Sequence, residues 1–138
     1  MVTPEEIRAL SENPKKNRYK NVPCLDCTRV KLKGNNEYIH ANYVQSASNP
    51  KRFICTQGPL SATANDFWRM IAQEKVESII MLCNVVEEGV RKCDEYFPTS
   101  EHNKKIYDDI SIELIKAVDT ASADSKWIVI SDIKMQWS

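Results

Sequence analysis

Glycine is scarce in this sequence, with three residues in 138, and nowhere are glycines close enough together to form a phosphate-binding loop. Long apolar runs are also missing. No stretch approaches the roughly 18 residues of a membrane-spanning helix, and the polar start lacks the apolar core of a signal peptide. Basic and acidic residues balance at 19 each, which gives no general attraction to nucleic acid or to an anionic membrane. We therefore expect a cytoplasmic protein with no membrane segment and no nucleic-acid partner.

The cysteines do not form a disulfide pattern, because there are five of them and their spacing is irregular. Reduced thiols in the cytoplasm fit this pattern better. Cys24-x-x-Cys27 is half of a possible zinc site, but Cys83 and Cys93 are too far apart to be the second half, and neither histidine completes a ligand set. We expect core or solvated thiols, with no metal and no cofactor.

The sequence has the composition of a globular domain, with 42% hydrophobic and 28% charged residues. The segment from Thr3 to Glu6 is typical of a helix start, with Thr3 as cap and Glu6 reaching back, and Asn13-Pro14 ends the helix. This predicts an N-terminal helix over residues 1–12, before a second region over residues 13–138. The basic stretch from Lys15 to Lys20 is interpreted as a solvated rim.

The remaining patterns predict a sheet with packed helices, an α/β (α+β) fold with a mixed twisted sheet. Strands are expected at Arg29–Leu32, Tyr38–Val44, Arg52–Thr56, residues 110–114 and Trp127–Met135, with loops at residues 33–36 and 120–125. An amphipathic helix is expected over Thr63–Glu74, capped by Thr63 and Asp66. The isoleucine-rich run Ser78–Leu82 is typical of a fully buried strand.

Four segments, in order and in register, resemble one family. They are Lys16-Asn17-Arg18-Tyr19 with Asp26-x-x-Arg29; Tyr38-Ile39-His40-Ala41-Asn42-Tyr43; Ile54–Leu60 with Asp66–Met70; and Ile80-Met81-Leu82 with Glu87, Lys92-Cys93, Tyr96 and Pro98. From about residue 13 onward the chain is similar to the cysteine-dependent protein-tyrosine phosphatases, of receptor and non-receptor type. The resemblance implies the N-terminal portion of that fold. With histidine at position 40, the second segment is similar to the corresponding segment of the phosphatases carried by parasitoid-wasp symbiotic viruses.

The resemblance also implies roles for four residues. Tyr19 matches the tyrosine that packs against the phosphotyrosine ring of the substrate, and Asn21 matches the residue that holds the substrate backbone. Glu87 matches a carboxylate that fixes the phosphate-binding arginine, and Lys92 lies on the same loop. The implied partners are phosphotyrosine-containing proteins.

The catalytic residues of that family are absent from the sequence. The family needs a cysteine with an arginine six positions later and an aspartate in a Trp-Pro-Asp loop. The residues six positions after the cysteines are Val30, Lys33, Ser61, Gly89 and Thr99, and those after the tryptophans are Arg69, Ile128 and Ser138. We therefore expect a domain truncated before the acid and nucleophile loops, with no catalytic residue and no hydrolysis by the chain alone.

Three hypotheses follow from this reading. The first is a partial phosphatase domain, and the second is a non-catalytic module, a pseudophosphatase, that binds phosphotyrosine proteins. The third is a degraded product without a stable fold. In the family fold other segments complete the sheet, so we expect Ile79, Ile80, Met81 and Leu82 to lack part of their cover and the chain to be marginally stable.

Overall fold

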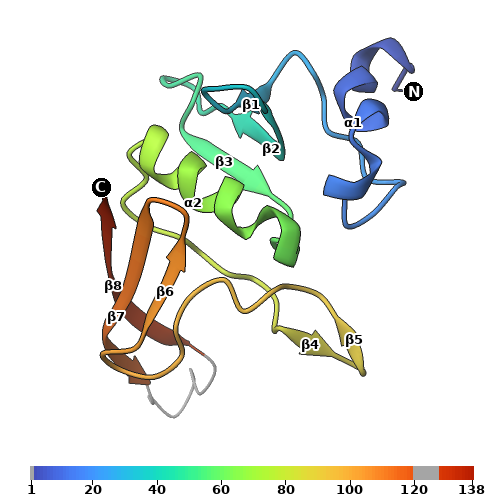
Figure 1. Cartoon of the computed structure of the whole chain (residues 1–138). Coiled ribbons are helices and arrows are strands. Elements are labelled where there is room, and N and C mark those ends of the chain that lie inside the picture. The colour runs from blue at the N-terminus through green and yellow to red at the C-terminus, as the bar shows by residue number, and fades with distance from the viewer. Residues whose placement is uncertain (1, 120–127) are drawn as a thin grey trace. The chain divides into compact units, whose positions relative to one another are not determined.

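The computed structural model describes residues 2–119 and 128–138, which form two compact units, Met1–Asp94 and Glu95–Ser138 (Figure 1). Both units combine irregular segments with antiparallel sheet, and the first also carries the helices, so the predicted class of helices with sheet is confirmed. The predicted division after residue 12 stays a prediction. Within the described residues, no helix has the length and apolar character needed to cross a membrane.

The first unit contains short helical segments, a three-stranded sheet, one longer helix and a hairpin. The helical segments are η1 (Glu5–Ile7), α1 (Arg8–Glu12), η2 (Pro14–Lys16), η3 (Ser61–Thr63) and α2 (Ala64–Gln73). The strands are β1 (Arg29–Lys31), β2 (Tyr38–Val44), β3 (Phe53–Thr56), β4 (Val86–Glu87) and β5 (Val90–Arg91). The sheet has the order β1-β2-β3, and β4 pairs with β5.

The N-terminal helix is split into η1 and α1 and ends before Asn13, close to the predicted end. The Glu6 carboxylate accepts a hydrogen bond from the Thr3 backbone N–H at 2.8 Å, as predicted. The prediction that Thr3 caps the helix is wrong, because Pro4 occupies the N-cap position and no side chain caps the helix. Leu10 is buried against Cys24 and Tyr38, which anchors the helix to the core.

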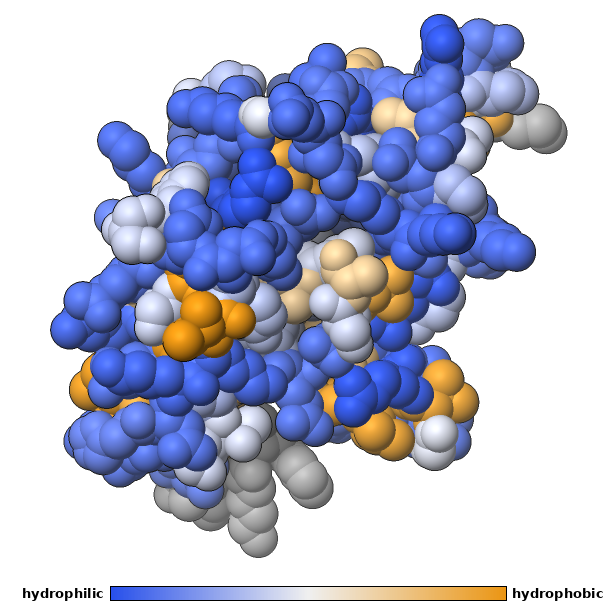
Figure 2. Space-filling view, viewed as in Figure 1, coloured by the Kyte–Doolittle hydropathy of each residue, from blue (hydrophilic) through white to orange (hydrophobic). Residues whose placement is uncertain are grey.

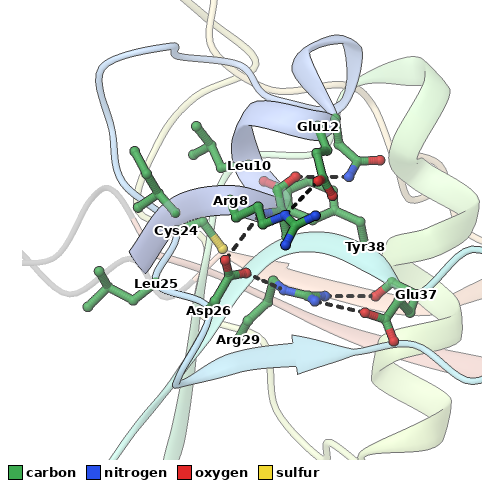
Figure 3. A network of polar contacts seen from close by, with 12 residues as sticks. Arg8, Leu10, Glu12, Cys24, Leu25, Asp26, Arg29, Glu37 and Tyr38 are labelled. Atoms are coloured by element: carbon green, nitrogen blue, oxygen red, sulfur yellow. Dashed lines mark hydrogen bonds and ion pairs between the residues drawn. The ribbon is translucent and has the colours of Figure 1, made fainter. Parts of the chain in front are cut away.

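A polar network holds this helix on the sheet (Figure 3). The Asp26 carboxylate accepts a hydrogen bond from the Ala9 backbone N–H at 3.1 Å and pairs with the Arg29 guanidinium at 3.2 Å. Arg29, which is 8% exposed, also pairs with Glu37 at 2.9 Å. The motif Asp26-x-x-Arg29 therefore has a structural role, since a buried arginine needs carboxylate partners.

Helix α2 buries one face, on which lie Phe67, Trp68, Met70 and Ile71, as the helical spacing predicts. Thr63 occupies the N-cap position as predicted, but its side chain makes no capping hydrogen bond to the helix. The Thr63 hydroxyl oxygen accepts a hydrogen bond from the Leu60 backbone N–H at 2.9 Å, because Thr63 closes the preceding turn η3. The Asp66 carboxylate pairs instead with Lys16 and Arg69.

The predicted buried strand at Ser78–Leu82 is wrong. The segment has no strand pairing within the described chain, and Ile80 and Leu82 are 82% and 92% exposed. An apolar run becomes a buried strand only where neighbouring strands supply hydrogen bonds and cover. No described strand lies beside it in a sheet. The expectation that its apolar residues lack part of their cover is confirmed.

The second unit is a three-stranded antiparallel sheet, β6 (Lys104–Tyr107), β7 (Ile110–Asp119) and β8 (Val129–Trp137). Ile110, Ile112 and Leu114 are at most 1% exposed and alternate with more accessible residues, so the predicted period-two strand is confirmed. The strand predicted at Trp127–Met135 is found as β8. Trp127 and the predicted loop at residues 120–125 lie outside the described residues.

Candidate functional site

Residues 17–21, which we call the recognition segment because they include the predicted substrate-binding residues, begin with an asparagine whose side chain is fully engaged. Asn17 donates through Nδ2 to the backbone oxygens of Leu10 and Asn13, at 3.0 and 2.9 Å. Its Oδ1 accepts from the Tyr38 hydroxyl at 2.5 Å and lies 3.1 Å from His40 Nδ1. Asn17 thereby ties the segment to both α1 and β2.

Arg18 fixes the same segment from the other side. Its guanidinium donates to three backbone oxygens, those of Gly58 at 3.0 Å, Pro59 at 2.7 Å and Arg91 at 3.2 Å. The Gln57 side chain accepts from the Arg18 backbone N–H at 2.9 Å and donates to the Lys16 carbonyl at 2.8 Å. Hydrogen bonds from a charged donor are among the stronger ones, so the backbone around residue 18 is held firmly.

The two predicted substrate-binding residues follow immediately and point to solvent. Tyr19 is 43% exposed, and Asn21 is exposed in the turn after it. An aromatic ring that is accessible on a backbone fixed by its neighbours is pre-organised to stack on another ring. The structure thus leaves Tyr19 and Asn21 accessible, while Asn17 and Arg18 supply the support.

The other two predicted site residues lie on the β4–β5 hairpin, which Arg18 joins to the recognition segment. Glu87 Oε1 accepts from the Asn84 backbone N–H at 2.9 Å. The Lys92 backbone N–H donates to the Val85 carbonyl at 2.9 Å. Glu87 is therefore used inside the hairpin, and both side chains are partly exposed.

The prediction of a solvated basic rim at Lys15–Lys20 is wrong for two of its basic residues, Lys16 and Arg18. Lys16 Nζ forms an ion pair with Asp66 at 2.6 Å, with side chains 19% and 11% exposed. Arg18 is used as described above. Both long side chains reach segments 40 to 73 residues away in sequence, which no local pattern reveals. Lys15 and Lys20 are exposed, as predicted.

His40 is 6% exposed and borders a small recess. The recess is also lined by Ile39, Thr56, Gln57, Pro59, Thr63 and Phe67. Because Asn17 Oδ1 is an acceptor, His40 Nδ1 carries the proton in this arrangement. Burial lowers the pKa of the His40 imidazole, and none of the lining side chains is a carboxylate that could offset a positive charge.

His40 should therefore make folding sensitive to acid. The unfolded imidazole binds a proton below its ordinary pKa of about 6.5 while the folded one resists it, so stability is lost as the pH falls through and below that value. The loss is about 1.4 kcal/mol for each unit of pKa difference. We expect His40→Asn to reduce the pH dependence of the unfolding free energy between neutral and mildly acidic pH, measured by urea titration.

The matched control for this experiment is His102→Asn, at an exposed position. It leaves His40 buried and should keep the wild-type slope of stability against pH. An equal slope in wild type and His40→Asn would contradict the expectation.

The two thiols with a shifted pKa, those of Cys24 and Cys93, do not have the lowered pKa of a nucleophilic cysteine. Burial raises the pKa of Cys24, which is 0% exposed, and raises that of Cys93 to about 11. Both are therefore protonated at neutral pH, as small apolar side chains of the core. In the described part of the chain all five cysteines are free, and no group of potential metal ligands gathers.

Comparison with known proteins places this geometry in a family. Residues 13–137 match the family described as protein-tyrosine phosphatase. The receptor-type tyrosine-protein phosphatase zeta of Rattus norvegicus is 50% identical over 95 residues, which cover 64% of this chain and 4% of that protein. The tyrosine phosphatase-like protein J1 of Microplitis demolitor bracovirus is 42% identical over 109 residues, 77% of this chain and 36% of that protein.

Solved structures agree with the sequence relatives. The catalytic domain of human protein tyrosine phosphatase non-receptor type 18 is similar with a TM-score of 0.82 and 32% identity, over 95% of this chain and 48% of that one. The chain thus spans less than half the length of the proteins it matches. The chain is similar both to receptor-type relatives and to a viral relative, so its membership of the viral branch stays a prediction. The fold is that of the N-terminal portion of the catalytic domain, and the chain belongs to the protein-tyrosine phosphatase family.

Proposed function

We propose that this chain carries the phosphotyrosine-recognition surface of a tyrosine-phosphatase domain, with Tyr19 stacking on the phosphotyrosine ring and Asn21 bonding the peptide backbone. The observation that supports this most directly is the contrast between neighbours. Asn17 and Arg18 are tied to the core, while Tyr19 stays 43% exposed. A structure of PTPN18, similar with a TM-score of 0.85, contains HER2 phosphopeptides, which is the class of ligand we propose here.

Hydrolysis is not part of the proposal for these 138 residues. No cysteine is followed six positions later by arginine, and the buried thiols of Cys24 and Cys93 have raised pKa values. A phosphocysteine intermediate needs a thiolate, and phosphate binding needs the paired donors of an arginine. We expect no release of phosphate from a phosphotyrosine peptide above the level of a buffer blank. Measurable turnover that survives repeated purification would contradict this part of the proposal.

Binding tests the recognition role directly. A fluorescently labelled phosphotyrosine peptide should bind the chain more tightly than its unphosphorylated form, measured by polarisation. Tyr19→Ala should weaken binding about 2- to 12-fold, because an aromatic pair contributes about 0.5–1.5 kcal/mol beyond area burial. Tyr19→Phe should keep most of the affinity, since stacking does not use the hydroxyl.

The matched control is Phe53→Ala, which removes another accessible ring, 55% exposed, from β3. It should leave peptide affinity unchanged. If the Phe53→Ala and Tyr19→Ala variants lose affinity equally, or if neither loses any, Tyr19 is not the recognition residue.

A non-catalytic interaction module is the second candidate function. An exposed Tyr19, together with buried thiols whose pKa values are raised, favours it, because binding then has no following chemical step. This reading predicts that the chain protects a phosphotyrosine peptide against an added active phosphatase, in proportion to occupancy. A partial domain that works only when completed by other sequence predicts no protection.

We also propose a reducing, cytoplasmic setting, since all five thiols are free and two are core residues.

A further inference from the structure

Two of the five thiols lie where the chain enters and leaves the β4–β5 hairpin. Cys83 is three residues before β4, and Cys93 is two residues after β5. The Lys92 and Cys93 backbone N–H groups both donate to the Val85 carbonyl, at 2.9 and 3.4 Å. Two residues that oppose one form the pattern of a β-bulge, which changes the direction of a side chain. With Val85 opposite Cys93, the strand period of two places Cys83 and Cys93 on the same side of the hairpin.

The two side chains interact with each other. Burial, the charge of the Cys83 thiolate and a hydrogen bond with the Cys83 thiol, in that order, raise the pKa of Cys93 to about 11, while Arg18 acts in the opposite direction. Thiols that share a hydrogen bond are neighbours. A disulfide joins cysteines whose Cβ atoms lie about 3.5–4.5 Å apart, so a small rearrangement of neighbouring thiols is enough to form one.

Cys93 is the fixed member of the pair. It is 1% exposed, and a Cβ atom added at Gly58 would lie 3.1 Å from its Sγ. The next residue, Asp94, donates its backbone N–H to the Pro59 carbonyl at 2.8 Å. The backbone of Cys93 is therefore held between the hairpin and the segment around Gly58.

Cys83 is the adjustable member. It is half-buried and lies in a bend, outside the paired strands. The hairpin that follows is at the surface, since Val86 and Val90 are 52% and 55% exposed. Figure 2 shows hydrophobic surface in the part of the view where β4 and β5 lie in Figure 1. A small oxidant can therefore reach Cys83, and the bend can move to bring its sulfur to Cys93.

We propose that Cys83 and Cys93 form a redox pair, a modification site at the base of the β4–β5 hairpin that hydrogen peroxide oxidises to a disulfide. Cys83 reacts first because it is the accessible thiol. Its sulfur attacks one peroxide oxygen, the O–O bond breaks, and the first water leaves as a sulfenic acid forms on Cys83. The Cys93 sulfur then attacks the Cys83 sulfur, the S–O bond breaks, and the second water leaves with the proton of the Cys93 thiol. The two thiols lose two electrons, which reduce the peroxide to water.

The pair lies next to the groups that hold the recognition segment. The carbonyls of Gly58 and Arg91, at 3.0 and 3.2 Å from the Arg18 guanidinium, belong to the two segments that Cys93 contacts. A bond to Cys83 draws the Cys93 sulfur away from Gly58, so we expect oxidation to shift the amide resonance of Arg18. The disulfide itself does not depend on phosphotyrosine recognition, and only an effect on Tyr19 would rest on the proposed function.

Peptide mapping after peroxide treatment tests the pairing. Trypsin cleaves after lysine and arginine and so separates the two cysteines into the peptides 76–91 and 93–104. We expect these two peptides to be found joined, with two hydrogens lost, and to separate on reduction by dithiothreitol. Replacing both Cys27 and Cys55 by serine should leave the joined peptides in place, because both residues lie outside the pair.

Cys83→Ser is the decisive variant, and Cys55→Ser, at an exposed position, is its matched control. Cys83→Ser should abolish the joined peptides and leave Cys93 reduced at the same peroxide concentration, while Cys55→Ser should behave as wild type. Both variants should keep the wild-type thermal melt, since neither thiol is fully buried. Peroxide should shift the Arg18 amide in wild type and in Cys55→Ser but leave it in place in Cys83→Ser.

Several results would overturn the pair. One is Cys83 joined to Cys27, to Cys55 or to a second chain in place of Cys93. Another is a Cys83 that stops at sulfenic or sulfinic acid while Cys93 stays reduced. Joined peptides with an unmoved Arg18 amide would exclude the link to the recognition segment. Peptide mapping reports the bond itself, so a chain that binds no phosphotyrosine peptide but forms the disulfide would contradict the proposed function alone.

Discussion

Replacing Trp68 by alanine is expected to destabilise the first unit by about 3–5 kcal/mol, the usual cost of removing a buried tryptophan side chain. Trp68 is 2% exposed and lies at the centre of the apolar face of α2. Its ring packs edge-on against Phe67, with ring centroids 5.6 Å apart. Because domains are stable by only about 5–15 kcal/mol, such a loss removes a large share of the unfolding free energy and would unfold a chain at the low end of that range.

Chemical denaturation followed by circular dichroism measures the effect. Trp68→Phe keeps an aromatic ring in the site and should lose clearly less stability than alanine does. Phe53→Ala, at a residue 55% exposed, should change stability little. If Trp68→Ala unfolds with the wild-type midpoint, the core does not depend on α2. A wild-type chain that shows no cooperative transition would instead favour a degraded product without a stable fold.

The elements that local sequence patterns predicted well are those whose pattern and burial coincide. The apolar spacing of residues 67–71 specifies the inward face of α2 because a helix needs no partner to set its hydrogen bonds. The alternation at Ile110, Ile112 and Leu114 likewise specifies a strand with one buried face. Ser78–Leu82 failed because a buried strand also requires neighbours, and its own residues do not determine whether they are present.

The candidate site was predictable in its exposed residues more than in its supports. Motif resemblance identified Tyr19, and the structure leaves that ring accessible. The roles of Arg18 and Gln57 depend on backbone oxygens and N–H groups about 40 residues away, and such partners carry no side-chain signature in a sequence. The role of Arg18 in joining the two segments by hydrogen bonds could be predicted only once Gly58 and Pro59 were known to lie beside it.

Gly58 is where the support of the site is least tolerant of change. A Cβ atom at Gly58 would lie 2.7 Å from the Lys92 carbonyl oxygen and 3.1 Å from Cys93 Cβ and Sγ. The Gly58 carbonyl also accepts from Arg18, and the Pro59 carbonyl accepts from the Asp94 backbone N–H at 2.8 Å. Gly58→Ala must therefore push the chain after β5 away from the segment around Gly58 that holds the recognition segment.

We expect Gly58→Ala to cost about 1–3 kcal/mol of unfolding free energy, the usual range for overpacking. It should also shift the amide resonances of Arg18 and Cys93 and weaken phosphotyrosine-peptide binding together with stability. Gly89→Ala is the informative comparison, because a Cβ there meets nothing within 4 Å and the cost comes only from its φ of +75°. That variant should lose stability while the Arg18 and Cys93 amides stay in place. Unchanged amides and peptide affinity in Gly58→Ala would show that the recognition segment does not depend on this contact, because the clash would then have been absorbed locally.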